Sequence, residues 1–543
     1  MVSDQAWLRP VTVNEALDGH VGLEVESLDR IYLNLYVPTL QVSGQAATFL
    51  GKYSGNPIPS PALMEQRGTR FRAAVRDFAE ANQIPVVRFA KDERKIDRIR
   101  PLLDQAEAAG RDRVVAIGVA QEFQRVFSAT KGENGHGAVW FEFYKSDRRV
   151  TCYYFYVWDH DFGAGFIKLC AYFPYPGKAW VNGHEWAKQQ ARHAGIGFEA
   201  LSNGFATCSD TAGLQEICDQ LGHGQIQVFI ERWLARLPLP LTGADREAGY
   251  WWQASMRQIE TSRTLVFDAP ARARAFFEAL IADNLDVGRP SNVEIVFKGS
   301  LNGRKADPPA DGYRTAIDRS VDGVVVNAFW KHSRIKQYLK DERALRIETV
   351  VNDPRDLGVN RRLENLAQLQ AKARAANHRL LEAERVGQNT VLESPAFARI
   401  SQPTVENGGQ RAPALRFGDP RVMALAGALA AIVHTITGTF TNKSLRAVVT
   451  GLSTTEYTSA RMSYDLRRLR LKGLIQRVPH SNAYRITDEG LRFAVFYIKV
   501  HDRVLTPLLA ADQPPAPPEV HAALEILSHH TDRSIALARL QPA

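Results

Sequence analysis

Residues 464–490 read YDLRRLRLKGLIQRVPHSNAYRITDEG, and this stretch decides the fold of the C-terminal part of the chain. Its first half continues an apolar stripe at helical spacing, so the sequence predicts a helix over 458–472 that ends at Gly473. Two short strand-like runs follow, 474–478 and 483–486, with a compact turn between them. The stretch therefore predicts a basic helix followed by a β-hairpin. The inward-facing residues of that helix are expected to be Met462, Leu466 and Leu469.

The residues on either side extend this pattern into a small domain. The apolar run 422–436 predicts a first helix, and 442–451 predicts a second one, which Thr441 is placed to cap. After the hairpin, Thr487 or Asp488 is expected to cap a last helix that runs to about residue 508. The predicted order is helix, helix, basic helix, hairpin and helix.

This order and the quoted stretch resemble the winged helix-turn-helix domains of bacterial regulators of the MarR and ArsR kind. The resemblance covers residues 414–510 of the 543-residue chain. It implies that the third helix enters the major groove of double-stranded DNA while the hairpin acts as a wing. A winged helix that only binds another protein, with its arginines in solvent, is the alternative. The residues expected on the DNA-binding surface are Arg461, Tyr464, Arg467, Arg468 and Arg470 on the helix, and Arg477, His480 and Arg485 on the wing.

The charge distribution supports a polyanion partner for this domain. The whole chain has 68 Lys and Arg against 59 Asp and Glu, a net charge of +9. Residues 411–510 alone carry 15 basic and 6 acidic side chains, which is the same excess, so the rest of the chain is balanced. Concentrated positive charge is typical of nucleic-acid-binding domains, because contacts with phosphates release counterions.

The front of the chain predicts an α+β multidomain protein. Strand and helix signals alternate over 1–136, which indicates a mixed α/β part, and strong strand signals over 137–401 indicate a β-rich α+β part. We expect a linker at 402–413, the winged helix at 414–510, and a Pro-containing tail with a short helix at 511–543. Over most of its length the chain also resembles a widespread family of uncharacterised bacterial proteins, a resemblance that implies no particular activity.

A second basic stretch, KHSRIKQYLKDERALRIE at 331–348, is a candidate nucleic-acid surface. Read as a strand, it places three basic residues and a tyrosine on one face, an arrangement that suits a nucleic-acid backbone. It is faintly similar to a Lys/Tyr/Lys and Arg-x-Glu pattern of phage and plasmid replication initiators, but their paired-histidine metal motif is absent. An edge strand that its charges guard against aggregation is the competing interpretation. The face consists of Arg334, Lys336, Tyr338 and Lys340.

A cluster of acidic residues and histidines suggests metal-dependent chemistry. Asp159, His160 and Asp161 lie between two aromatic strands, and carboxylates that converge with imidazole can hold Mg²⁺ or Mn²⁺ for phosphodiester cleavage. The stretch DHDFGAG is equally a good turn, because Asp and Gly are turn residues. The further candidate ligands are His184, Glu185, Glu122 and Asp29.

Two classes of function therefore stay open, and the sequence does not decide whether the protein is an enzyme. The first is a DNA-binding protein, regulatory or replication-associated, with double-stranded DNA and a homodimer as expected partners. The second is a metal-dependent nuclease or initiator that the winged helix targets. No phosphate-binding loop, nucleophile elbow or dinucleotide fingerprint occurs, so no other cofactor is expected.

The sequence also predicts where the protein works. No apolar run reaches the roughly 18–20 residues that span a bilayer, and the start MVSDQAWLRP lacks a signal-peptide pattern, so we expect a cytoplasmic protein with no membrane partner. Sparse cysteines without metal-binding spacing are expected to be buried thiols. They are Cys152, Cys170, Cys208 and Cys218.

Overall fold

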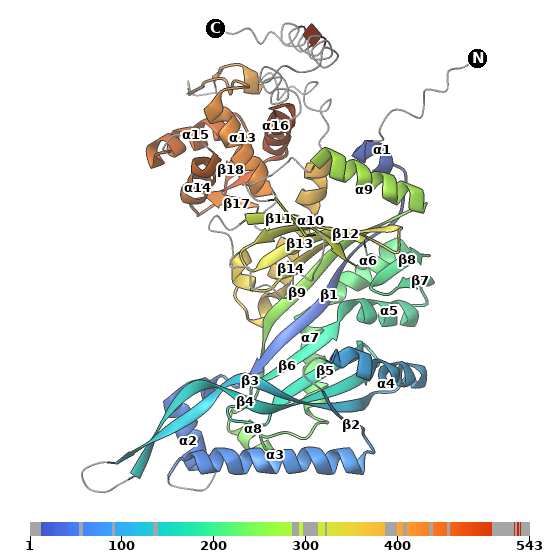
Figure 1. The fold of residues 1–543 in the computed structure, drawn as a ribbon, viewed down its shortest axis with the longest axis vertical. Helices are drawn as coiled ribbons and strands as arrows, with labels where there is room; N and C mark the ends of the chain where they lie inside the picture. Colours follow the sequence, from blue (N-terminus) through green and yellow to red (C-terminus); the bar gives the residue numbers. More distant parts are fainter. Residues whose placement is uncertain are drawn as a thin grey trace. The chain divides into compact units, whose positions relative to one another are not determined.

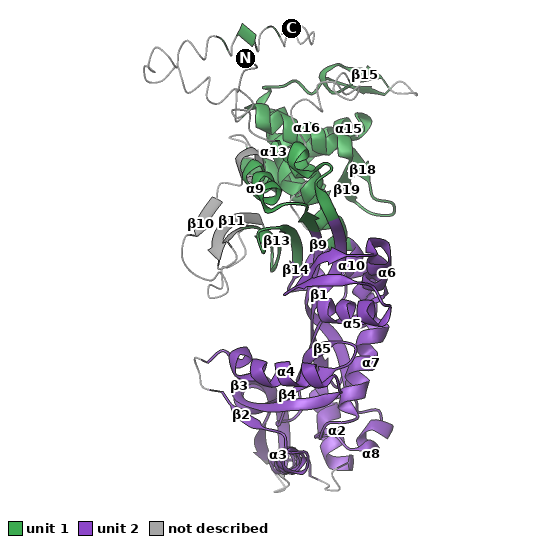
Figure 2. Cartoon of the chain, turned by 90° about the vertical axis from the view of Figure 1, so that its right-hand side faces the viewer, with its two compact units in different colours: residues 1–22, 265–349, 372–543 green, residues 23–264, 350–371 purple. Residues whose placement is uncertain are grey.

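The computed structural model shows an α+β protein whose chain divides into two compact units (Figure 2). Unit 1 comprises residues 1–22, 265–349 and 372–543, and unit 2 comprises residues 23–264 and 350–371. The described residues are 12–53, 58–89, 93–133, 139–284, 293–296, 313–320, 323–385, 399–405, 410–433, 438–452 and 457–501, with 526, 529, 530 and 533.

Unit 2 is built on a mixed sheet with the strand order β9-β1-β6-β5-β4-β3-β2 (Figure 1). Neighbours from β1 to β3 are antiparallel, and β2 joins β3 in parallel. The strands alternate buried and partly exposed residues, as expected for a sheet with two different faces. Their bounds are β1 (Val21–Tyr36), β2 (Val86–Arg88), β3 (Arg113–Glu133), β4 (Val139–Asp159), β5 (Gly163–Cys170), β6 (Gly177–Asn182) and β9 (Gln253–Phe267).

Helices cover the two faces of this sheet unequally. On one face, α4 buries Ile99 and Leu103 against β3 and β4. On the other, Phe71 of α3 meets Tyr153 edge to face, and Phe229 of α7 lies against the β4–β5 turn. The helices are α2 (Ser43–Tyr53), α3 (Pro61–Ala81), α4 (Lys95–Ala109), α5 (Gly183–His193), α6 (Thr211–Gln220), α7 (His223–Leu234) and α8 (Gly243–Glu247), and a small hairpin pairs β7 (Phe198–Leu201) with β8 (Gly204–Cys208).

Unit 1 contains a second set of strands and the C-terminal helices. Its strand order is β10-β11-β12-β13-β14, with β10 parallel to β11 and antiparallel pairs from β11 to β13. Helices α1 and α9 contact each other. The bounds are α1 (Val13–Leu17), α9 (Pro270–Asn284), β10 (Val293–Val296), β11 (Tyr313–Ser320), β12 (Gly323–Trp330), β13 (Ser333–Lys340), β14 (Ala344–Val351) and α10 (Leu366–Arg385).

Residues 420–501, here called the C-terminal segment, contain the predicted elements in the predicted order, with one strand, β17, that the sequence analysis did not predict. A helix, a short strand, two helices, a hairpin and a last helix share one apolar core, which contains Met462, Leu466 and Leu469. Thr441 and Thr487 cap helices as expected, and Gly473 follows the third helix at a φ of +73°. The elements are α13 (Pro420–Val433), β17 (Thr439–Thr441), α14 (Asn442–Leu452), α15 (Ser459–Leu471), β18 (Ile475–Arg477), β19 (Ala483–Ile486) and α16 (Asp488–Val500), and the strand order is β17-β19-β18.

The expected domain boundary at residues 136/137 is not where the chain divides. It falls between β3 and β4, which pair along most of their length, from Arg113↔Trp158 to Glu133↔Val139. β4 is one continuous strand, because β3 also pairs with its polar middle part, residues 145–149. The N-terminal and middle parts therefore share one sheet, which local patterns in the sequence do not reveal.

The segment 402–413, expected to be a linker, is also held by contacts. Its two ends pair as β15 (Thr404–Val405) and β16 (Arg411–Ala412), and Lys472 donates to the carbonyl oxygens of Arg399 and Gln402. Of the predicted tail, only residues 526, 529, 530 and 533 are described. Over the residues that the structure describes, no helix combines the length and the apolar character needed to cross a bilayer.

Candidate nucleic-acid interface

Helix α15 presents a basic outer surface. Thr458 starts the helix by accepting the backbone N–H of Arg461 at 3.3 Å. The apolar stripe faces the core, which turns the opposite side of the helix toward solvent. Within the described part of the chain, neither Arg467 nor Arg470 has a carboxylate partner, so their charges are uncompensated. The exposed residues of this surface are Arg461, Tyr464, Arg467 and Arg470.

A buried carboxylate fixes α15 in place. Asp465 is fully buried and pairs with Arg421 of α13, whose Nη2 lies 2.6 Å from Oδ2. Tyr457 donates its hydroxyl to the same oxygen, and burial together with this hydrogen bond raises the pKa of Tyr457 to about 12. The Arg421 guanidinium also lies 5.4 Å from the ring centre of Tyr464. These contacts set the rotation of α15 and hence the side that its exposed arginines occupy.

Arg468 corrects the expectation that it lies on the outer surface. It is only 9% exposed, and it donates to the backbone carbonyls of Pro413 and Ala414. Burial lowers its pKa, while Asp465 at 3.8 Å opposes that change. Its role is to hold the preceding chain against α15, because two carbonyl oxygens there would otherwise lose their donor.

The β18–β19 hairpin carries the other expected residues in exposed positions. Arg477 donates to the Ser481 carbonyl at 3.1 Å and to the Asn482 side chain at 3.2 Å, so its guanidinium braces the turn. Arg485 donates to Gln476 at 2.9 Å, and His480 adopts a φ of +53° at the tip. The hairpin therefore presents basic groups on a rigid turn.

The second basic face, on β13, is less available than its sequence suggests. Tyr338 is buried and donates its hydroxyl to Glu348 at 2.6 Å, and Lys336 forms an ion pair with the same carboxylate. Arg334 and Lys340 remain partly exposed. Strand β13 lies between β12 and β14, so the interpretation as an edge strand is wrong as well. Glu348, ten residues along the chain from Tyr338, supplies the counter-charge that the sequence pattern did not reveal.

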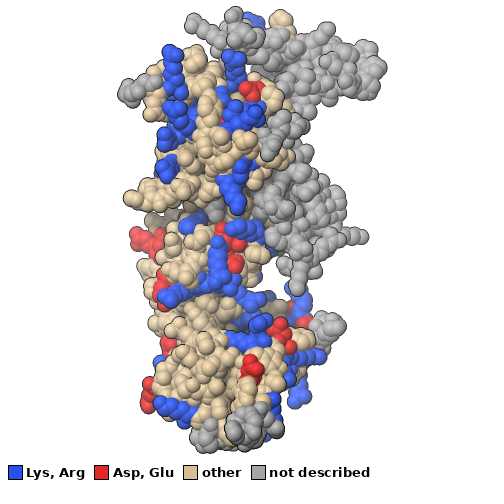
Figure 3. Space-filling model, turned by 90° about the vertical axis from the view of Figure 1, so that its left-hand side faces the viewer, with Lys and Arg blue, Asp and Glu red and all other residues tan. Residues whose placement is uncertain are grey.

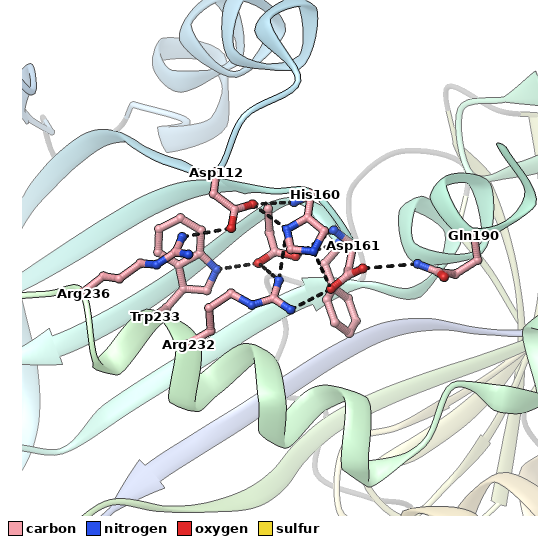
Figure 4. A network of polar contacts seen from close by, with 9 residues as sticks. Asp112, His160, Asp161, Gln190, Arg232, Trp233 and Arg236 are labelled. Carbon is pink, nitrogen blue, oxygen red and sulfur yellow. Dashed lines mark hydrogen bonds and ion pairs between the residues drawn. The ribbon is translucent and has the colours of Figure 1, made fainter. Parts of the chain in front are cut away.

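The acidic turn at residues 159–161 is held by two arginines (Figure 4). Asp159 is fully buried; its Oδ1 accepts the backbone N–H groups of Asp161 and Phe162, and its Oδ2 accepts Trp233 Nε1 and Arg232. Arg232 also bonds Asp161 at 2.8 Å. Every one of these contacts stabilises a turn, so the geometry favours the turn interpretation of this stretch.

Asp112 joins this cluster from the start of β3. It accepts the backbone N–H of His160 at 2.8 Å and Arg236 at 2.9 Å. Burial opposes ionisation of Asp112, but the bonds from His160 and Arg236 outweigh it and lower the pKa. Ligand atoms of Asp112, Asp159 and His160 lie within 4.8 Å of one another, which is close enough for a metal ion. Arg232 and Arg236 already neutralise the carboxylates, which weakens the case for a cation there.

The other candidate ligands lie in separate contacts. His184 Nε2 is 3.2 Å from Asp29, and Glu185 pairs with Lys188 at 2.8 Å. Glu122 accepts Lys95 at 2.7 Å and also pairs with Lys168. In the described part of the chain, none of these joins the one group whose geometry could hold a metal. The expected set of ligands is therefore divided among several sites.

The residues that sequence reasoning missed are the partners of these groups. Asp112, Arg232 and Arg236 meet the turn only because β3 and α7 bring them there. Arg421 and Tyr457 reach Asp465 in the same way. All four cysteines are free thiols, and Cys152, Cys170 and Cys218 are buried as expected, but Cys208 is partly exposed.

Comparisons with known proteins do not decide among these sites. No family model, no curated protein and no solved structure matches the chain. The case for a function therefore depends on the geometry and charge of the chain itself.

Proposed function

We propose that the C-terminal segment is a winged helix that binds double-stranded DNA, with α15 in the major groove and the β18–β19 hairpin on the flanking backbone. The observation that carries this proposal is the outer surface of α15, where Arg467 and Arg470 are exposed and have no acidic partner among the described residues, on a helix that the buried Asp465 holds in position.

Charge and chemistry support the same assignment. In Figure 3, Lys and Arg gather over the upper part of the view, which the C-terminal segment forms, and acidic groups are sparse there. Guanidinium groups can bond two acceptors of guanine at once, and Lys443 of α14 adds an exposed cation for phosphate contacts. A surface used only for protein contacts has no need of this uncompensated charge.

The nuclease alternative has weaker support. Its carboxylates at Asp112, Asp159 and Asp161 are bonded to Arg232 and Arg236, and the remaining candidate ligands lie elsewhere. We therefore propose a DNA-binding protein, regulatory or replication-associated, as the function that the geometry favours.

The test is duplex binding by the full-length protein. A 30-base-pair duplex should bind with an affinity that falls steeply between 50 and 200 mM salt. Reversing three exposed charges of α15 (Arg461→Glu, Arg467→Glu and Arg470→Glu) should abolish this binding. The matched control reverses three exposed arginines of α3 and α4 (Arg70→Glu, Arg76→Glu and Arg98→Glu) and should retain it. Equal loss in both variants would show that only net charge matters and would sink the proposal.

A further inference from the structure

One face of the unit 2 sheet carries an aromatic row that runs across four neighbouring strands. Tyr32 of β1 pairs with Trp180 of β6, Trp180 with Phe166 of β5, and Phe166 with Tyr156 of β4. Residues opposite one another in a sheet point to the same face, so the four rings stand side by side. The rings of Phe166 and Trp180 are nearly parallel, with an interplanar angle of 14° and centroids 5.9 Å apart.

The row is covered at one end and open at the other. Tyr156 is buried, and Phe89 meets it edge to face on the side where α4 packs. Tyr32, Trp180 and Phe166 remain partly exposed, although each is a large apolar or amphipathic ring. Exposed aromatics gathered in this way mark a binding surface more often than isolated exposed rings do.

Basic side chains lie next to the aromatic row, close to the ring of Tyr32. Lys178 pairs with Lys168 across β6 and β5, and Lys178 Nζ lies 5.3 Å from the ring centre of Tyr32. Arg257 of β9 reaches the same ring at 5.5 Å. Among the described residues, neither Lys178 nor Arg257 has a carboxylate partner. The face therefore combines stacking surfaces with uncompensated positive charge.

The acidic residues near this face are already bonded to other cations. Glu122 is bonded to Lys95 and Lys168, and Glu260 pairs with Arg30, so these acids already have partners. Burial and the neighbouring Arg257 and Lys168 lower the pKa of Lys178 to about 8. A polyanion bound here would relieve this repulsion.

We propose that this sheet face binds single-stranded nucleic acid, with bases stacked on Tyr32, Trp180 and Phe166 and phosphates near Lys178 and Arg257. Sheets with exposed aromatics bind single strands in this way, because every base has a face for stacking and the backbone follows the cations. A rigid duplex keeps its bases stacked inside and offers no face to the row. The site is independent of the C-terminal segment, which contributes none of these residues.

The experiment uses full-length protein that carries the three α15 charge reversals, so that duplex binding does not interfere. Fluorescein-labelled dT20 and rU20 are titrated by fluorescence anisotropy at low salt. Saturable binding of either oligonucleotide is expected, and the stronger of the two identifies DNA or RNA as the natural strand. Lack of binding to both would overturn the proposal. Duplex binding that survives the reversals would instead overturn the proposed function and leave this site standing.

Variants of the row then locate the site. Trp180→Ala and Tyr32→Ala should each weaken binding about tenfold or more, the loss of one stacked base. Trp180→Phe keeps a ring and should restore most of the affinity. Trp140→Ala removes an exposed tryptophan from the far end of β4 and should change nothing. Loss of binding with Trp140→Ala, or none with Trp180→Ala and Tyr32→Ala, would overturn the site.

Two further measurements keep the result independent of folding. Arg257 is exposed, so Arg257→Ala should leave the near-ultraviolet circular dichroism unchanged while it reduces both affinity and its salt dependence. Ultraviolet crosslinking to a bromouridine-substituted strand should label the peptides of Tyr32 or Trp180. Crosslinks confined to residues 461–485 would place the strand on α15 and contradict the proposal.

Discussion

The outer surface of α15, which is mainly arginine, and the aromatic row of unit 2 are both proposed to bind nucleic acid, but they are formed differently. The α15 surface comes from one continuous helix, so its basic residues stand out in the sequence. The aromatic row takes one residue from each of four strands, and only the register of those strands brings them together. The comparison teaches that a binding surface made by a single element can be predicted from spacing, whereas one made by a sheet cannot.

Both surfaces also have a carboxylate beneath them. Asp465 holds α15 through Arg421 and Tyr457, and Glu122 holds Lys168 at the edge of the aromatic row, with Lys95 and Tyr154 as its other partners. In each case the acid pairs with cations beside the surface. Other exposed cations, Arg467 and Arg470 on α15 and Lys178 and Arg257 beside the row, have no carboxylate partner among the described residues.

The largest effect is expected at Asp465. Asp465→Ala removes a fully buried acid and leaves Arg421 and the Tyr457 hydroxyl without their partner, which should lower the free energy of unfolding by about 3 kcal/mol. Urea denaturation followed by circular dichroism measures this loss. The control Asp77→Ala changes an exposed acid on α3 and should cost almost nothing. Equal stability of both variants would show that Asp465 does not anchor α15.

Substitutions of two adjacent arginines should distinguish a side chain that contacts DNA from one that stabilises the fold. Arg467→Ala should weaken sequence-specific duplex binding by about 1–3 kcal/mol if the side chain contacts a base, with stability unchanged. Arg468→Ala should instead lower stability, because the carbonyls of Pro413 and Ala414 lose their donor. Parallel binding and thermal-unfolding measurements distinguish them. A loss of stability with Arg467→Ala would place that residue in a structural role too.

Glu122 gives the corresponding test in unit 2. Bonds to Lys168, Lys95 and Tyr154 outweigh the cost of burial and lower the pKa of Glu122 from 4.5 to about 2. A lowered carboxylate pKa contributes stability that is complete above pH 4.5 and is lost as the pH falls toward 2. Glu122→Gln should therefore be less stable near neutral pH and should lose less stability on acidification. Parallel acid curves for the two proteins would contradict this coupling.

The smallest expected effect is on the salt dependence of duplex binding. Each phosphate contact removed from the duplex interface should reduce the slope of log affinity against log salt by roughly one, so Arg470→Ala is expected to shift the slope without changing sequence preference. A titration from 50 to 200 mM salt measures it. An unchanged slope would mean that Arg470 contacts no phosphate.

The sequence predicted the C-terminal segment closely, for a physical reason. Met462, Leu466 and Leu469 repeat at the helical period, and capping residues mark the ends of their helices, so local signals suffice. Arg468 was misplaced because its acceptors lie in a segment that looked like a linker. Helical spacing indicates which residues face the core but not which polar side chains find partners beside it.

In the front part, the sequence predicted individual strands but not their pairing. The boundary at 136/137 was wrong because β3 and β4 pair across it, a contact that no local pattern encodes. The partners of the acidic cluster could not be predicted for the same reason: Asp159 is bonded to Arg232 and Trp233, and these partners lie on a helix far along the chain. The residues of the aromatic row appeared only as ordinary strand formers.

Buried Lys472 determines whether the C-terminal segment can fold without the residues that precede it. Its ammonium group is inaccessible to solvent and donates to Arg399, Gln402 and Thr404, all of which precede the segment. A version of the chain that starts after these residues would lose all three acceptors and uncover the side of α15 that they pack against, so we expect it to be less stable than the full chain. The stretch that leads into the C-terminal segment is therefore part of the same folded unit, rather than a spacer in front of it.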